Sequence, residues 1–243
     1  MGAALFWGLV AGSSLVLGGL VALRWHIRSA LLGLVMAFGA GVLISAVAYD
    51  LVDEAIRTTA GGGGVGLGLA AGAVTFFVGD LMLDRRGAEG RKRSGGEQAS
   101  GSPLAIVLGI VLDGIPESIV IGIGLLAGEG VGVAVVAAVF LSNMPEAIAA
   151  TTGLAASGWT RGKILGLWSV VALVGGLASL LGYAAFGDAS PRTLAFVLAF
   201  AGGAILTMLA DTMMPEAFEH GGKRVGLATT LGFGLALALT SLE

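Results

Sequence analysis

The stretch PLAIVLGIVLDGIPESIVIGIGLL, residues 103–126, decides the fold of this chain. A helix that crosses the hydrocarbon of a bilayer needs about 20 apolar residues, and this stretch is long enough. It nevertheless carries Asp113 and Glu117 near its middle. A carboxylate at that depth costs roughly 2.5–3.5 kcal/mol on insertion scales, so such residues are rare there and mark function. The stretch therefore predicts a membrane helix that carries a functional site.

The rest of the chain has the same character. Of 243 residues, 56% are hydrophobic and 12% are charged, whereas soluble domains carry about 25% charged residues. Eight apolar stretches together predict one all-α transmembrane domain over residues 1–243. They run over residues 3–23, 29–52, 63–83, 103–126, 131–157, 163–186, 193–215 and 224–242. The net charge of -3 excludes a nucleic-acid partner, which requires a basic surface.

One connection is long. Residues 85–102 are rich in Gly, Ser, Arg and Lys and predict a flexible polar linker. If the N-terminus is outside, the inner connections collect eleven of the 13 Lys and Arg residues, Lys92 among them, and the outer ones two. Lys and Arg favour the cytoplasmic side. We therefore expect both termini outside, this third loop in the cytoplasm, and a multi-pass protein of the cell (inner or plasma) membrane.

Two pairs of segments resemble each other in constant register. Residues 41–55 read GVLISAVAYDLVDEA and residues 203–217 read GAILTMLADTMMPEA. Residues 113–119 read DGIPESI and residues 142–148 read SNMPEAI. With eight spans the members of each pair run in opposite directions. This predicts an inverted 3+2+3 repeat, which is typical of secondary transporters with a substrate site at the repeat interface. Glycines at 64, 68 and 72 predict a close helix contact.

The polar residues of the second pair share helix faces. Asp113 and Glu117 are four residues apart, and Ser142 and Asn143 precede Glu146 by four and three. Carboxylates in one dry place repel each other unless a proton or cation lies among them, and a divalent cation is the simplest choice. These five residues are our predicted metal ligands.

Two prolines lie among these ligands. Pro116 and Pro145 have no amide hydrogen, so the carbonyls of Leu112 and Leu141 lose a helical hydrogen bond. Freed carbonyls at membrane depth are tolerated where they line a polar cavity. The alternative is that each Pro-Glu pair begins a helix with Asp113 as an N-cap. Two such pairs in matched register favour the site.

Other carboxylates lie nearer the ends of the predicted spans, and they predict an entrance and an exit for a cation. The alternative is that they lie in headgroup water. They are Asp50, Asp53 and Glu54 at the outer end of the second span, Asp80 at the inner end of the third, and Asp211 and Glu216 at the inner end of the seventh. The two histidines, His26 and His220, are expected in solvated loops.

The whole chain resembles the ZIP family of divalent-metal transporters, most specifically through residues 113–117 and 143–146. The resemblance implies that Asp113 takes the place of the family's usual histidine, Gly114 that of an asparagine, and Ser142 that of a histidine or glutamine. It also implies an elevator-like motion and metal movement into the cytoplasm. Lipid and divalent cations are then the partners, a homodimer is an open option, and no organic cofactor is expected.

The departures from the family pattern bear on the metal. No histidine remains in the core site, and Gly114 offers no ligand, so we expect one metal rather than two. Oxygen ligands suit hard cations such as Mn²⁺ and, to a lesser degree, Fe²⁺, whereas imidazole favours zinc. Zinc also binds carboxylates. We therefore expect broad or shifted specificity among zinc, manganese and iron, with weaker zinc binding than at a site that contains histidine.

Three other functions compete with metal transport. The first is a metal-binding membrane sensor or scaffold without transport. The second is proton conduction through the same carboxylates. The third is an intramembrane aspartyl protease that uses Asp50 and Asp80, but Phe77 stands where that signature requires glycine. We expect a transporter and no enzyme.

Overall fold

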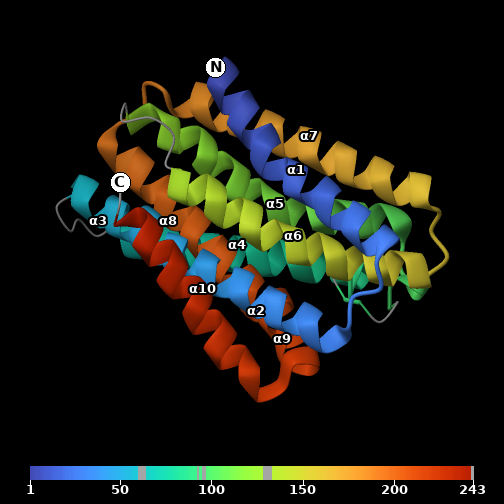
Figure 1. Ribbon diagram of the computed structural model, residues 1–243. Helices are drawn as coiled ribbons and strands as arrows, with labels where there is room; N and C mark the ends of the chain where they lie inside the picture. Colours follow the sequence, from blue (N-terminus) through green and yellow to red (C-terminus); the bar gives the residue numbers. More distant parts are fainter. Residues whose placement is uncertain (60–63, 92, 95–96, 128–132, 242–243) are drawn as a thin grey trace.

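The computed structural model is all-helical and describes residues 1–59, 64–91, 93–94, 97–127 and 133–241 (Figure 1). Lys92 and the terminal Leu242 and Glu243 lie outside the described residues. The long helices are α1 (Gly2–Arg24), α2 (Ser29–Ala46), α4 (Gly64–Leu83), α5 (Pro103–Gly124), α6 (Val133–Ala156), α7 (Arg161–Phe186), α8 (Pro191–Met208) and α10 (Val225–Thr240). The short α-helices are α3 (Glu54–Thr59) and α9 (Met214–Gly221). The other short segments are η1 (Val47–Asp53), η2 (Asp84–Ala88), η3 (Glu97–Ser100), η4 (Leu125–Ala127), η5 (Leu209–Met213) and η6 (Gly222–Arg224).

Within the described residues, seven helical ranges are long and apolar enough to cross a membrane. The last of them, Pro191–Thr240, contains both the seventh and the eighth predicted stretch. The number of eight spans therefore stays a prediction. Large apolar side chains point outward along these helices; Leu67, Leu227 and Leu231 are each about 70% exposed. The protein is a multi-span membrane protein whose outer surface matches lipid.

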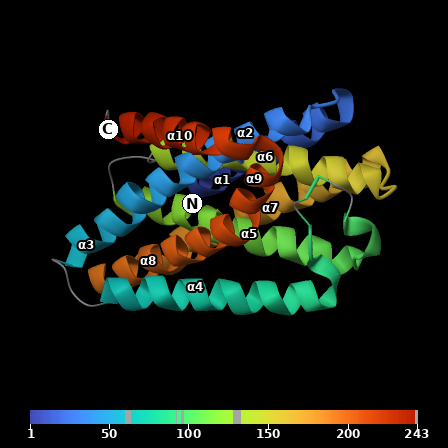
Figure 2. The same ribbon diagram turned by 90° about the horizontal axis from the view of Figure 1, so that it is seen from below.

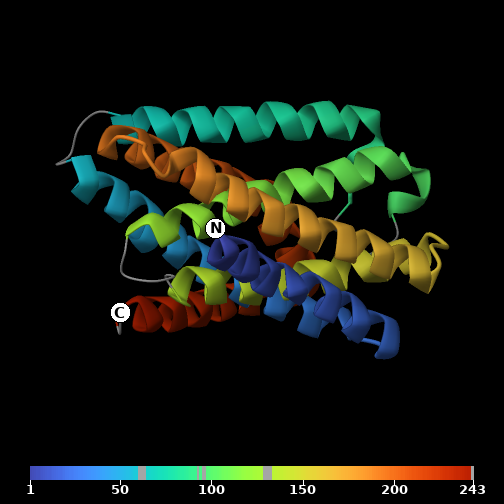
Figure 3. The ribbon, with the colours of Figure 1, turned by 90° about the horizontal axis from the view of Figure 1, so that it is seen from above.

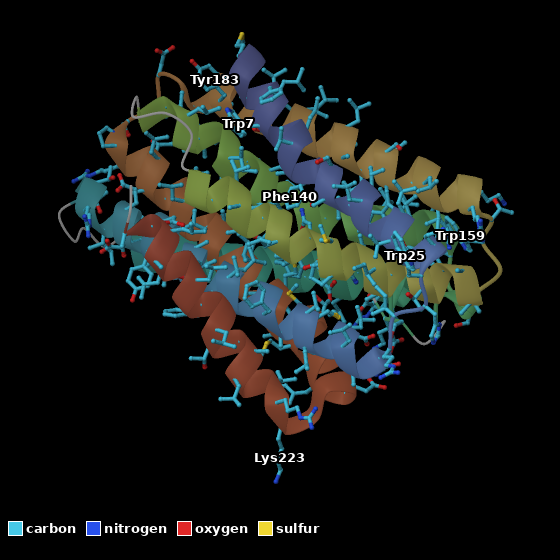
Figure 4. The ribbon with its side chains drawn as sticks, viewed as in Figure 1. Trp7, Trp25, Phe140, Trp159, Tyr183 and Lys223 are labelled. Carbon is cyan, nitrogen blue, oxygen red and sulfur yellow. The ribbon has the colours of Figure 1, made fainter. Side chains whose placement is uncertain are left out.

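Aromatic residues mark the two ends of the α1–α7 pair. Figure 4 shows Trp7 and Tyr183 near the end that carries the N-terminus, and Trp25 and Trp159 near the other end. Trp and Tyr are enriched where a membrane meets water. The apolar faces of α1 and α7 between these ends fit the hydrocarbon layer.

Helices α1, α5, α6 and α7 pack against one another through glycines. Helix α1 lies along α7 and α6, and α5 lies along α7. A side chain at Gly18 would strike the carbonyl of Met144 in α6, and one at Gly122 would strike the carbonyl of Ser179 in α7. Small residues let membrane helices approach backbone to backbone. We call these four helices the first group.

Helices α2, α4, α8 and α10 form a second group by the same means. In Figures 2 and 3, α4 lies along α8; in Figure 2, α2 also lies along α10. A Cβ at Gly72 would strike the Phe200 carbonyl, as one at Gly232 would strike that of Phe38. Gly68 also packs closely on α8, whereas Gly64 faces open space. The predicted glycine contact is therefore real at two of its three positions.

The two segments that resemble each other in sequence also share a local irregularity. Helix α2 continues into the π-helical segment η1, and α8 continues into the π-helical segment η5. Asp50 lies in η1 and Asp211 lies in η5. Because π-helical turns often occur at functional sites, both aspartates are candidates for function.

We predict that Gly72→Ala destabilises the protein by about 1–3 kcal/mol, because the new methyl group meets a backbone carbonyl that cannot move freely. Gly66→Ala on the same helix is the matched control, since nothing lies near its added methyl group. Thermal unfolding in detergent measures both. Equal melting temperatures for the two variants would contradict the close contact of α4 and α8.

Candidate metal site

The two Pro-Glu pairs lie inside continuous helices. Pro116 is an interior residue of α5 and Pro145 an interior residue of α6. Asp113 is consequently no N-cap, and the alternative that these pairs begin helices is wrong. A third Pro-Glu pair, Pro215-Glu216, lies in the first turn of α9, which directly continues the π-helical segment η5.

All five predicted ligands are buried. Their exposed fractions are 2% for Asp113, 2% for Glu117, 0% for Ser142, 7% for Asn143 and 5% for Glu146. Buried carboxylates need compensating partners, since a lone charge in an apolar interior costs several kcal/mol. The three carboxylates, which are costly to place in an apolar environment, are thus almost fully buried.

Three of the five ligands meet at one small cavity, which we call the central cavity. Asp113, Asn143 and Glu146 line it together with Leu15 of α1 and Trp168 of α7. Its volume is about 20 Å³, enough for about one water molecule.

Glu117 and Ser142 lie elsewhere. Glu117 lines a cavity of about 10 Å³ against α2 and α8, which we call the Glu117 cavity. The Ser142 hydroxyl donates to the carbonyl of Val139, 3.0 Å away, within its own helix. In the part of the chain that the structure describes, no three His, Asp or Glu side chains are grouped closely enough to hold a metal ion. A metal held by Asp113, Glu117 and Glu146 together stays a prediction.

Asp113 has a partner that the sequence analysis missed. Arg91, in the linker predicted to be flexible and polar, is only 2% exposed. Its Nε donates to Asp113 Oδ2 at 3.0 Å and its NH2 to Asp113 Oδ1 at 2.9 Å. NH1 donates to Asp84 Oδ1 at 3.2 Å, and NH2 also donates to Asp80 Oδ1. One guanidinium therefore joins three carboxylates.

The linker is shaped for this insertion. Gly87 and Gly90 have φ angles of 97° and 70°, which side-chain-bearing residues rarely adopt. Ala88 between them is fully buried, and Gly109 of α5 leaves room for the stem of Arg91. Burial lowers the pKa of the Arg91 guanidinium, but the charges of Asp113 and Asp80 and the hydrogen bonds to them outweigh burial and raise it. Arg91 is a permanent cation in this position.

A cavity of about 380 Å³ lies where α3, α5 and α8 meet, and we call it the Asp50 cavity. Asp50 and Glu54, which the sequence predicts at one end of the cation pathway, both line this cavity. Asp53 instead forms a 2.7 Å ion pair with Arg57 on its exposed side. The structure thus brings two of these three carboxylates to the same cavity.

A further cavity of about 190 Å³, the Asp80 cavity, lies beside the linker. Its charged lining consists of Asp80, Asp84, Glu89, Arg91, Arg93 and Asp211. The predicted pathway residues Asp80 and Asp211, from different helices, therefore meet here.

Glu216 contacts the linker through hydrogen bonds with Ser94. It is 3% exposed, and its Oε1 accepts hydrogen bonds from the amide and hydroxyl of Ser94, at 2.8 and 2.7 Å. His220 Nε2 lies 3.1 Å from the same oxygen. His220 belongs to α9 and is 20% exposed, so its prediction as a solvated loop residue is wrong. His26 is exposed, as expected.

Comparison with known proteins adds an independent observation. No family model matches the chain. The zinc transporter GufA of Myxococcus xanthus is 31% identical over 250 aligned residues, which cover 98% of this chain and 97% of that one. The chain belongs to the same family as this transporter. The alignment therefore covers nearly the full length of both chains.

We predict that Asp113→Asn destabilises the protein by about 3 kcal/mol, because it removes one charged partner from a buried ion pair. Asp188→Asn, at an exposed position between α7 and α8, serves as the control. Chemical unfolding in detergent micelles compares the two. If Asp113→Asn were as stable as the control, the pair with Arg91 would contribute nothing to the fold.

Proposed function

We propose that the protein transports a divalent metal cation of the zinc, manganese or iron class across the cell membrane. The observation that carries the proposal is the burial of Asp113 and Glu146 at one cavity between proline-containing helices inside a membrane domain. The family relative is named a zinc transporter, which supports the same class of cargo. The resemblance to the ZIP family agrees. The metal is the substrate in this proposal, and no enzyme activity is involved.

We propose an eight-span, inverted 3+2+3 architecture with both termini outside. Two contacts support it because they recur in the two halves. Gly72 and Gly203 meet the carbonyls of Phe200 and Leu69, and Gly232 and Gly41 meet those of Phe38 and Thr229. In each of these two contacts, one glycine lies at a matched position of the repeat, Gly41 or Gly203. The other glycine lies in the third or in the last predicted span. The matching π-helical segments η1 and η5 support the same symmetry.

The proposed pathway connects the cavities in sequence. The cation enters the Asp50 cavity, whose lining shares Val120 and Val135 with the Glu117 cavity. Glu117 and Asp113 are separated by one turn of α5, about 6 Å along its axis. From the central cavity, the proposed path continues past Asp113 and the Arg91 side chain bonded to it, and reaches the Asp80 cavity. This cavity would open to the cytoplasm.

Movement of one helix group against the other would move the site between the two sides. Close glycine contacts hold α1 to α6 within the first group and α2 to α10 within the second. The Glu117 cavity lies between the groups, since α5 and α6 line it from one side and α2 and α8 from the other. This arrangement supports an elevator-type motion.

The competing functions are less well supported. An aspartyl protease would need Asp50 and Asp80 at one catalytic centre, but they line different cavities. A metal sensor without transport would need no pathway, yet acidic cavities lie toward both ends of the helices. A proton conductor would use the same carboxylates, so metal flux in the absence of a pH gradient separates it from a metal carrier.

We predict that Glu117→Gln and Glu146→Gln each reduce zinc and manganese flux in proteoliposomes at least tenfold. Each change removes a negative charge that would offset the loss of water from the cation. Glu219→Gln is the matched control, because Glu219 is 56% exposed and lies outside both cavities. Flux is followed with an enclosed metal-sensitive dye.

Wild-type flux at background level for every metal would contradict transport, and metal binding without flux would favour the sensor. Normal flux in either site variant would place the substrate site elsewhere. Melting temperatures of the variants are measured alongside, so that a loss of flux is not mistaken for a loss of folding.

We also predict that Asp113→His raises the ratio of zinc flux to manganese flux severalfold, because imidazole favours zinc over harder cations. Asp188→His, the same change at an exposed position between α7 and α8, is the control for an added histidine. Flux of each metal is measured singly and in competition. An unchanged ratio would show that Asp113 does not contact the metal.

A further inference from the structure

Arg91 occupies the position that a cation bound to Asp113 would need. Both carboxylate oxygens of Asp113 accept hydrogen bonds from the guanidinium, at 3.0 and 2.9 Å. This bidentate arrangement is the strongest that an arginine and a carboxylate form. A metal that approaches Asp113 from the linker side meets a positive charge that already uses both oxygens.

The guanidinium also lies at the boundary of two cavities. Asp113 lines the central cavity, whereas Asp80, Asp84 and Arg91 itself line the Asp80 cavity. The side chain of Asp113 is 2% exposed and that of Asp84 is 31% exposed. The guanidinium therefore links a carboxylate that is shielded from water to one that is partly exposed to it. Arg91 therefore lies between the central cavity and the Asp80 cavity.

Arg91 has other partners to retain if it leaves Asp113. Its NH1 already donates to Asp84 and its NH2 to Asp80. The stem passes Gly109, which has no side chain to hold it in place. A shift toward the Asp80 cavity keeps the guanidinium paired with two carboxylates while it releases the third.

We propose that Arg91 is a tethered cation that holds Asp113 in the metal-free carrier and that the arriving metal displaces it onto Asp80 and Asp84. The exchange keeps the buried carboxylate compensated in both states, which an unpaired Asp113 would not be. Arg91 thereby sets the apparent affinity for the metal and separates the central cavity from the Asp80 cavity. This inference rests on the proposed function, because it assumes that Asp113 binds the transported metal.

The test is metal binding to the purified full-length protein in detergent, by isothermal titration with Zn²⁺ and with Mn²⁺. Arg91→Gln is expected to lower the dissociation constant at least tenfold, because no internal cation competes for Asp113. Arg93→Gln is the matched control on the same linker; its side chain is 49% exposed and reaches only Glu219, at 3.9 Å. The control is expected to bind metal like the wild type.

A second variant keeps the charge of Arg91. Gly109→Ala places a methyl group against the Arg91 stem and should push the guanidinium away from Asp113. It is expected to tighten metal binding severalfold, in the same direction as Arg91→Gln. It decides the question alone if Arg91→Gln does not fold. Gly166→Ala, at an exposed position of α7 with open space around the added methyl group, controls for the substitution itself.

A purely structural role for Arg91 would give a different pattern. In that case Arg91→Gln would lower the melting temperature and leave metal affinity unchanged or weaker, and this result would overturn the inference. The Asp113→Asn background gives a further check, since there Arg91→Gln should no longer tighten binding. Persistent tightening in that background would also overturn it.

The two proposals fail in distinguishable ways. If the wild type neither binds nor transports metal, and Arg91→Gln does not either, the proposed function fails. If the wild type binds and transports metal but neither Arg91→Gln nor Gly109→Ala binds it more tightly, only the role of Arg91 fails.

Discussion

The charge of Asp113 has to be compensated in a place that water hardly reaches. Transfer of an isolated carboxylate from water into an apolar interior costs far more than one hydrogen bond returns. The protein meets this requirement with Arg91, which the chain inserts from outside the helical core. The turn through Gly87 and Gly90, the buried Ala88 and the gap at Gly109 all serve that insertion.

Glycine shapes the architecture around this charge. Between membrane helices the surrounding lipid is as apolar as the side chains, so association depends on close packing. Gly18, Gly41, Gly72, Gly122 and Gly232 bring backbones together within the two helix groups. The cavities lie where such packing gives way to polar side chains. Contacts of this kind hold α1 to α6 and α5 to α7 in the first group, and α4 to α8 and α2 to α10 in the second.

Much of the fold follows from local pattern. Runs of apolar residues of membrane length predicted the long helices, and α1 spans Gly2–Arg24 where residues 3–23 were expected. The helical range that begins at Ser29 instead continues to Thr59, beyond the predicted end at residue 52. The burial of the five predicted ligands was also predictable, because they lie in the middle of such runs. The separation of Glu117 from Asp113 into different cavities was not predictable, because helix spacing places both on one face but does not say which neighbour that face meets.

The sequence by itself determined that this is a helical membrane protein with acidic groups inside its apolar helices, since hydropathy and residue spacing are local properties. Only the tertiary structure decided which charges meet. Arg91 lies 22 residues from Asp113, and Ser94 lies 122 residues from Glu216, in a linker whose composition predicts a solvated loop. A basic linker contains several arginines that are equivalent by composition. Which of them becomes buried depends on the backbone turn at Gly87 and Gly90 and on the space that α5 leaves open at Gly109, and that space is not a property of the linker's own sequence.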